Sequence, residues 1–241
     1  EDIGVIGIFS PCPCHFEQIR AALHAGKHVI VTKPMVTSLE HAREVVRLVD
    51  ETGLKLLVGQ SMRWNGMFQT IHDMYAAGEI GEVRLAESYY VHDLRPVLDV
   101  SPWRYEMPQD FIYGGVCHPA DLLRWFLGEV DEVFAYGVRG LVEPRYPADK
   151  EDDFVISLKY RSGAIARILG GFDMIHPPSL WGEHFHGVGI GLYGTKASLL
   201  NDRIVREYYP DGKPVEERIT PSADRLTHSG EVIGFLRHFE E

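Results

Sequence analysis

The first sixty residues alternate short apolar runs with stretches of helical periodicity. A continuous apolar run over residues 3–9 is typical of a parallel strand that is covered on both faces. Residues 15–24 repeat apolar side chains at helical spacing before Gly26, and Ser38 and Gly53 bound a second helical stretch. Short strands over residues 28–31 and 54–58 follow these helices. The alternation predicts a parallel sheet with right-handed crossovers.

After Gly59 the pattern changes to a series of strands with few helices. Turn pairs such as Ser162-Gly163 and Asp211-Gly212 separate some of them, which favours antiparallel hairpins. Helical periodicity returns over residues 68–75 and 119–126. We therefore expect an α/β region over residues 1–62, followed over residues 63–241 by an α+β region with a large, mainly antiparallel sheet. Its strands are expected over residues 83–91, 130–138, 154–160, 164–169, 189–193, 197–200 and 204–208.

Composition and charge limit the classes of partner that the protein is expected to bind. The 241 residues are 45% apolar and 24% charged, an ordinary globular mixture. With 24 Lys and Arg against 35 Asp and Glu, the net charge is −11, which argues against a nucleic acid or an anionic membrane as the partner. No apolar run approaches the ~20 residues of a spanning helix. Three cysteines and the lack of a secretory signal favour a reducing, cytoplasmic location.

Both ends of the chain are unusual. It starts with Glu1 and Asp2 instead of Met and runs at once into the first strand. It closes on residues 235–241, which read as the start of an amphipathic helix with no stop signal. We expect a fragment that is cut at both ends, with its last domain truncated.

Polar, turn-rich segments follow each of the three predicted parallel strands, where an α/β sheet binds its ligands. Lys33 lies at the end of a buried strand and before a proline, where an ammonium group is costly unless it meets an anion or a polarised oxygen. His118 begins a helix after Gly114 and Gly115, which let backbone approach a ligand closely. Lys33 and His118 are therefore candidates for chemistry.

Two patterns could suggest a metal. Cys12-x-Cys14-His15 has the wrong spacing for a zinc knuckle and has no second ligand pair. His184-x-His186 is a weak signal, since alternate residues on a strand share a face. We expect no metal site, although an enzyme that uses these two histidines and a cysteine stays an alternative.

Five segments, in order along the chain, resemble motifs of the Gfo/Idh/MocA family of nicotinamide-dependent sugar and polyol oxidoreductases. Residues 22–34 resemble its "AGKHVxxEKP" stretch, and residues 58–64 resemble the segment after the next strand. Trp103-Arg104 resembles the Trp-Arg pair ahead of the glycine cluster, and His118-x-x-Asp121 resembles the end of "DxGxHxxD". Residues 193–198 resemble a late "GTKGS" turn. The resemblance implies a partial Rossmann domain followed by an α+β domain.

The resemblance also implies roles for single residues. His118 would take the proton of a substrate hydroxyl while hydride goes to C4 of NAD or NADP, and Lys33 would orient that hydroxyl and lower the pKa of the catalytic group. Cofactor contacts would come from Ser10, Pro11, His15, Pro34, Gln60, Trp103 and Arg104. Besides Lys33 and His118, substrate contacts would come from Asp93, Arg95, Tyr113, Asp173 and His176.

The chain departs from the family pattern at three points. Thr32 stands where the family usually has Glu, and Gly114 stands where it usually has an Asp that helps to hold the histidine. Asp110 or Asp121 could substitute for that carboxylate. The glycine-rich loop G-x-G-x-x-G is missing, and with it the residues that choose between NAD and NADP. We expect that loop upstream of Glu1, and we expect these 241 residues alone to be inactive.

The function implied is hydride transfer between NAD(P) and a secondary alcohol of a sugar, inositol or related polyol. The alternative is a catalytically silent relative that binds a dinucleotide or a sugar as a regulator; Lys33 and His118 favour the enzyme. The predicted helices are too few to cover both faces of the large sheet. An uncovered apolar face usually marks an interface, so we expect a homo-oligomer packed through it.

Overall fold

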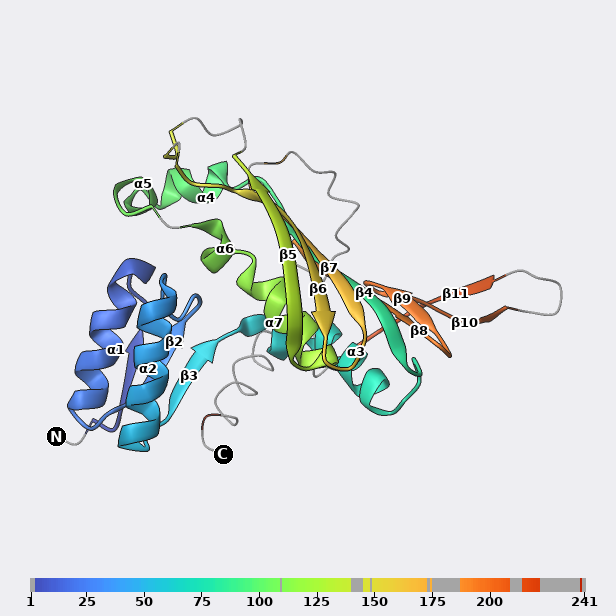
Figure 1. The fold of residues 1–241 in the computed structure, drawn as a ribbon, viewed down its shortest axis with the longest axis horizontal. Helices are drawn as coiled ribbons and strands as arrows, with labels where there is room; N and C mark the ends of the chain where they lie inside the picture. The colour runs from blue at the N-terminus through green and yellow to red at the C-terminus, as the bar shows by residue number, and fades with distance from the viewer. Residues whose placement is uncertain are drawn as a thin grey trace.

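The computed structural model describes residues 3–108, 110–139, 145–147, 149–172, 174, 187–208, 214–221 and 239. Its N-terminal part is a three-stranded parallel sheet in the order β1–β2–β3 (Figure 1). This sheet confirms the predicted alternation of strands and helices. The strands are β1 (Val5–Ile8), β2 (His28–Thr32) and β3 (Leu56–Gly59), and the helices between them are α1 (His15–His24) and α2 (Leu39–Thr52).

Helix α2 begins and ends where its capping residues require. The Ser38 hydroxyl accepts a 3.2 Å hydrogen bond from the amide of His41, and Gly53 ends the helix with a φ of 65°.

Helices α1 and α2 pack against each other, because two successive right-handed crossovers in the same direction leave both helices on one face of the sheet. Val5 is 39% exposed. The expectation that the first strand is covered on both faces is therefore wrong for the described residues.

The second part is built on an eight-stranded sheet in the order β11–β10–β9–β8–β4–β7–β6–β5. Every neighbouring pair is antiparallel except β4 and β7, which run parallel. The large, mainly antiparallel sheet is thus confirmed. Its strands are β4 (Val83–Val91), β5 (Val130–Val138), β6 (Asp153–Tyr160), β7 (Ile165–Gly171), β8 (Val188–Gly194), β9 (Ser198–Leu200), β10 (Arg203–Tyr208) and β11 (Pro214–Arg218).

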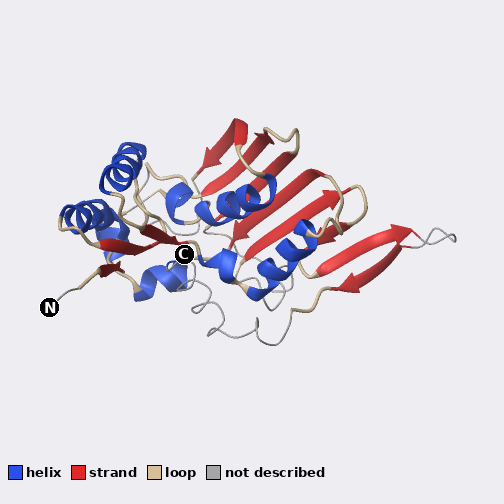
Figure 2. Ribbon diagram, turned by 90° about the horizontal axis from the view of Figure 1, so that it is seen from below, coloured by secondary structure: helices blue, strands red, loops and turns tan. Residues whose placement is uncertain are grey.

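The described helices gather on one face of this sheet and leave its other face without helices (Figure 2). The strand β6 shows the alternation that results: Phe154, Ile156 and Leu158 are buried in the core, while Val155 between them is 52% exposed. The helices of this part are α3 (Gly66–Ala76), α4 (Arg95–Val100), α5 (Trp103–Glu106), α6 (Phe111–Gly114) and α7 (Cys117–Leu127).

The sequence pattern did not predict every element. Strand β11 is exposed along its whole length, so it carries no alternation of apolar and polar residues. Helices α4, α5 and α6 are only four to six residues long, too short to show a helical period. All three cysteines are free thiols. Among the described residues, no helix has both the length and the apolar character to cross a bilayer.

Candidate active site

The turns after β1 and β2 are joined by one buried side chain, His15. Its Nδ1 lies 2.9 Å from the carbonyl oxygen of Pro34, and its Nε2 lies 2.9 Å from that of Ser10. His15 is only 1% exposed, and it begins α1 directly after the short 3-10 helix at Cys12–Cys14. His15 therefore holds the turn after β1 next to the turn after β2, at the carboxyl edge of the parallel sheet.

Lys33 connects this edge to the second part of the chain. The peptide bond from Lys33 to Pro34 is cis. The Lys33 ammonium donates a 2.7 Å hydrogen bond to the carbonyl oxygen of Gly114, 81 residues further along at the end of α6. Burial lowers the pKa of Lys33 below its usual value, and the charge of Arg104 lowers it further, against the opposing effect of the Cys117 thiol. The lysine is thus a half-buried cation at the junction of the two sheets.

His118 lies beside Lys33 in the first turn of α7. Its side chain is 4% exposed, and Nδ1 is enclosed without a hydrogen-bond partner among the described residues. Burial, followed by the nearby charges of Lys33 and His92, lowers the pKa of His118 to about 3. The ring of Tyr90 packs edge-on against the imidazole at 5.6 Å. The imidazole is therefore neutral at physiological pH, as a proton acceptor must be.

Neither carboxylate that could replace the missing family Asp contacts His118. Asp110 pairs with Lys150, whose Nζ lies 3.2 Å from Oδ1. Asp121 accepts two 2.7 Å hydrogen bonds from the guanidinium of Arg63. Each carboxylate instead pairs with a nearby cation, so neither holds His118 in this structure, and a contact of either with the substrate stays a prediction.

Arg104 and Gln60 complete the group around Lys33. The Arg104 guanidinium lies 4.4 Å from the ring centroid of Trp103, and its Nε is buried without a partner among the described residues. Gln60 follows β3, its Oε1 is buried without a partner there too, and its side chain lies beside the Cys117 thiol. The group around Lys33 thus contains one hydrogen-bond donor, Arg104 Nε, and one acceptor, Gln60 Oε1, that have no partner among the described residues.

Sequence reasoning did not single out two neighbours of this group. Cys117 lies next to Lys33 and Gln60, and burial raises the pKa of its thiol. Tyr90, near the end of β4, contacts His118, and burial raises its pKa to about 12. The position of Cys117 directly before His118 was the only signal in the sequence for either residue.

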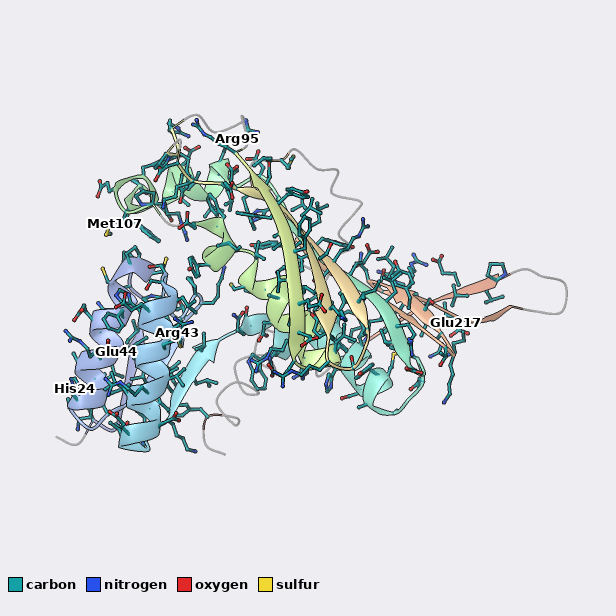
Figure 3. All side chains as sticks on the ribbon, viewed as in Figure 1. His24, Arg43, Glu44, Arg95, Met107 and Glu217 are labelled. Carbon is teal, nitrogen blue, oxygen red and sulfur yellow. The ribbon has the colours of Figure 1, made fainter. Side chains whose placement is uncertain are left out.

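Of the predicted substrate residues, the structure describes Asp93, Arg95 and Tyr113. Asp93 and Arg95 pair with each other through 2.6–3.1 Å hydrogen bonds, and the Arg95 guanidinium holds the pKa of Asp93 below its usual value. Figure 3 places Arg95 at the upper end of the large sheet, away from Glu217 in the β10–β11 hairpin. Tyr113 is half-buried in α6, next to Gly114. Outside the described residues lie Asp173, His176, His184 and His186.

Two observations bear on other kinds of site. Among the residues that the structure describes, no three His, Cys, Asp or Glu side chains are placed to hold a metal ion. The hollow of about 610 Å³ lined by Glu87, Phe134 and Arg167 lies on the open face of the large sheet. Neither Lys33 nor His118 lines this hollow, so the candidate active site is identified by the chemistry of its residues and not by the size of a cavity.

Family models of known proteins match both parts of the chain. Residues 1–60 match the NAD-binding Rossmann fold of an oxidoreductase family, and residues 68–200 match the GFO/IDH/MocA C-terminal domain. The chain belongs to the Gfo/Idh/MocA family. Its members are NAD(P)-dependent oxidoreductases, which confirms the resemblance seen in the sequence.

Curated relatives agree with this assignment. An uncharacterized oxidoreductase of Escherichia coli, YhhX, is 32% identical over 66% of this chain and 44% of its own length. The 1,5-anhydro-D-fructose reductase of Ensifer adhaerens is 28% identical over 86% of this chain and 59% of its own length. A scyllo-inositol 2-dehydrogenase (NADP(+)) of Bacillus subtilis is 27% identical over 72% and 47%. The chain thus spans about half the length of these relatives.

Solved structures share the fold. An inositol dehydrogenase homologue from Azotobacter vinelandii, complexed with NADH and myo-inositol, superposes with a TM-score of 0.71 at 22% identity. It matches 93% of this chain and 59% of its own chain. A levoglucosan dehydrogenase complexed with NADH and L-sorbose gives a TM-score of 0.79 at 18% identity, over 99% and 71%. At these identities the likeness shows the fold alone.

Proposed function

We propose that the whole protein transfers hydride between NAD(P) and a secondary alcohol of a sugar, inositol or related polyol. The observation that supports this most is that Lys33 lies close to His118 at the carboxyl edge of the parallel sheet. A regulatory relative without turnover would have no need to keep a neutral, buried histidine beside a cation. Relatives that act on an inositol and on an anhydro sugar support the substrate class.

The side chains at the edge of the sheet fit a nicotinamide cofactor. Gln60 Oε1 and Arg104 Nε are buried hydrogen-bonding atoms without partners among the described residues, and a polar ligand would satisfy them. The cofactor, when bound, supplies the acceptor or donor of hydride. The residues proposed to hold it are Ser10, Pro11, Pro34, Gln60, Trp103 and Arg104, with His15 supporting the turns behind them.

His118 is the proposed acid/base. We assign the transferred proton to Nε2, because protein encloses Nδ1. In oxidation, the neutral imidazole accepts the proton of the substrate hydroxyl; in reduction, the imidazolium returns it. Lys33 holds the substrate oxygen and stabilises the negative charge that develops on it. Its positive charge also keeps His118 neutral until the hydroxyl proton arrives.

The assay for this function is NAD(P) reduction by the whole protein with a panel of inositols, aldoses and alditols. We expect at least one of them to be oxidised, and Lys33→Ala to lower kcat at least 10²-fold while NAD(P)H binding persists. A conservative Lys33→Arg variant is the comparison, because it keeps the charge and changes its position. Equal activity of wild type and Lys33→Ala would contradict the proposed site.

We also propose that the whole protein assembles through the open face of the large sheet. The partner positions across the strands place Tyr136, Val155 and Leu169 in one row on this face, and these side chains are 68%, 52% and 45% exposed. Beside that row, Arg167 pairs with Glu87, which also accepts a 2.6 Å hydrogen bond from the Tyr193 hydroxyl. Such a mixed apolar and charge-paired surface suits a second copy of the chain.

Light scattering tests the assembly. We expect the whole protein to be a homo-oligomer at micromolar concentration, and Phe134→Glu, at a side chain 61% exposed on this sheet, to dissociate it. The control Leu39→Glu changes a side chain that is 58% exposed on α2 and leaves the oligomer intact. A wild type that is monomeric at micromolar concentration would contradict the proposal.

A further inference from the structure

The candidate active site holds two cationic side chains with no anionic partner among the described residues. The hydrogen bond of Lys33 goes to a neutral acceptor, the carbonyl oxygen of Gly114. Arg104 stacks on Trp103, and its Nε is buried without an acceptor. Arg104 is close enough to Lys33 to lower its pKa. Two neighbouring cations repel each other, so the site carries uncompensated positive charge.

The carboxylates on the surrounding segments do not compensate this charge. Glu106, in the same helix as Arg104, is exposed. Four others each form an ion pair with a different cation: Asp93 with Arg95, Asp99 with Arg145, Asp110 with Lys150, and Asp121 with Arg63.

A half-buried cation pair without an anion is costly unless a ligand supplies the charge. A carboxylate suits it well, because its two oxygens match the planar fork of a guanidinium and can also reach an ammonium group. Since Lys33 also lies beside His118, a hydroxyl next to that carboxylate would be near the proposed base. The site thus favours a substrate in which acid and alcohol groups are neighbours.

We propose that the substrate is a polyhydroxy acid, such as an aldonic acid, whose carboxylate binds between Arg104 and Lys33. This inference rests on the proposed function and narrows its substrate class. The carboxylate keeps all its bonds in the reaction. The carbon next to it loses hydride to NAD(P)⁺, which becomes NAD(P)H; its hydroxyl loses a proton to His118; and its C–O single bond becomes a carbonyl. In this account Arg104 contacts the substrate carboxylate instead of the cofactor, which the other proposed cofactor residues hold, and it is a specificity residue.

Matched pairs of substrates test the inference on the whole protein. We expect kcat/KM to be about 10- to 100-fold higher for gluconate than for glucitol, and for galactonate than for galactitol, the range of a charge-assisted hydrogen bond. Arg104→Gln should lower the acid-to-alditol ratio at least tenfold. Gly114→Asp, which places a protein carboxylate beside Lys33, should lower it as well. The control is Arg47→Gln, which changes an exposed ion pair on α2 and should leave the ratio unchanged.

Binding gives a second readout that needs no turnover. Calorimetry should detect gluconate binding that weakens at least tenfold in Arg104→Gln, with no comparable effect on glucitol. Activity with alditols but no preference for the acids would overturn this inference and leave the proposed function standing. A stronger preference for glucose 6-phosphate than for gluconate would overturn the choice of carboxylate. No NAD(P)-dependent turnover with either class would overturn the proposed function and this inference together.

Discussion

Acid should destabilise the whole protein through His118, and a single substitution should remove that effect. The unfolded chain protonates this histidine near pH 6.5, whereas burial and the nearby charge of Lys33 lower its pKa to about 3 in the folded state. Between these values the unfolded state binds a proton that the folded state does not. The free energy of unfolding therefore falls as the pH drops from 6.5 towards 3, and the contribution of His118 is fully present only above pH 6.5.

The size of the effect follows from the two pKa values. Each pH unit below 6.5 costs about 1.4 kcal/mol, so this group alone should remove about 2 kcal/mol by pH 5.0 and roughly 5 kcal/mol by pH 3. The useful comparison is between pH 7.5 and 5.0, where most carboxylates stay ionised. His118→Gln has no proton to gain, so its free energy of unfolding should fall by about 2 kcal/mol less than that of wild type over this interval.

Urea unfolding at the two pH values measures this difference in slope, whatever the absolute stability of the variant. The control is His24→Gln, at an exposed histidine whose side chain points away from the end of α1 (Figure 3). The control should keep the acid sensitivity of wild type. If His118→Gln and wild type lost the same free energy between pH 7.5 and 5.0, the imidazole would not be held neutral, and the reasoning about the site would fail.

Two further substitutions test the packing around the site. A Cβ on Gly115 would lie 2.1 Å from the ring of buried Phe172, so Gly115→Ala should lower the free energy of unfolding by about 1–3 kcal/mol. The control is Gly4→Ala, where no atom lies within 4 Å of the new Cβ, and it should change that free energy by less than about 0.5 kcal/mol. Equal effects of the two substitutions in thermal unfolding would refute the close contact. The Arg63–Asp121 ion pair is half-buried and bidentate. A double-mutant cycle on the free energy of unfolding, with Arg63→Gln and Asp121→Asn, should therefore give a coupling energy of about 1–3 kcal/mol. A coupling energy near zero would show that the pair is not formed.

Local patterns in the sequence predicted most of the regular elements. The strands expected over residues 83–91 and 130–138 occur there as β4 and β5, and the glycine and serine signals bounded α2 correctly. Hydrophobic period depends only on near neighbours in the chain, so it cannot give the order of strands in a sheet. The parallel pairing of β4 with β7 is such a non-local feature, and hairpin signals between other strands say nothing of it.

The candidate site was predictable to a similar extent. The position of Lys33 at the end of a buried strand indicated a role, and the structure places it beside His118. Its hydrogen-bond partner could not be predicted, because a backbone carbonyl, here that of Gly114, has no signature in the sequence. The same holds for Asp121, where the pattern suggested a replacement carboxylate and the structure instead pairs it with Arg63.

The kinetic effect of removing His118 tests the central claim most directly. With the best alcohol substrate and saturating NAD(P), His118→Ala in the whole protein should lower kcat by ~10²–10⁴-fold, the usual value of general acid–base catalysis. NAD(P)H binding, followed by fluorescence, should stay within a few-fold of wild type. Because the imidazole is already neutral, the wild-type oxidation rate should show no rise from titration of His118 between pH 5 and 8. A His118→Ala variant with kcat within a few-fold of wild type would contradict the account, and the acid/base would then have to be another residue.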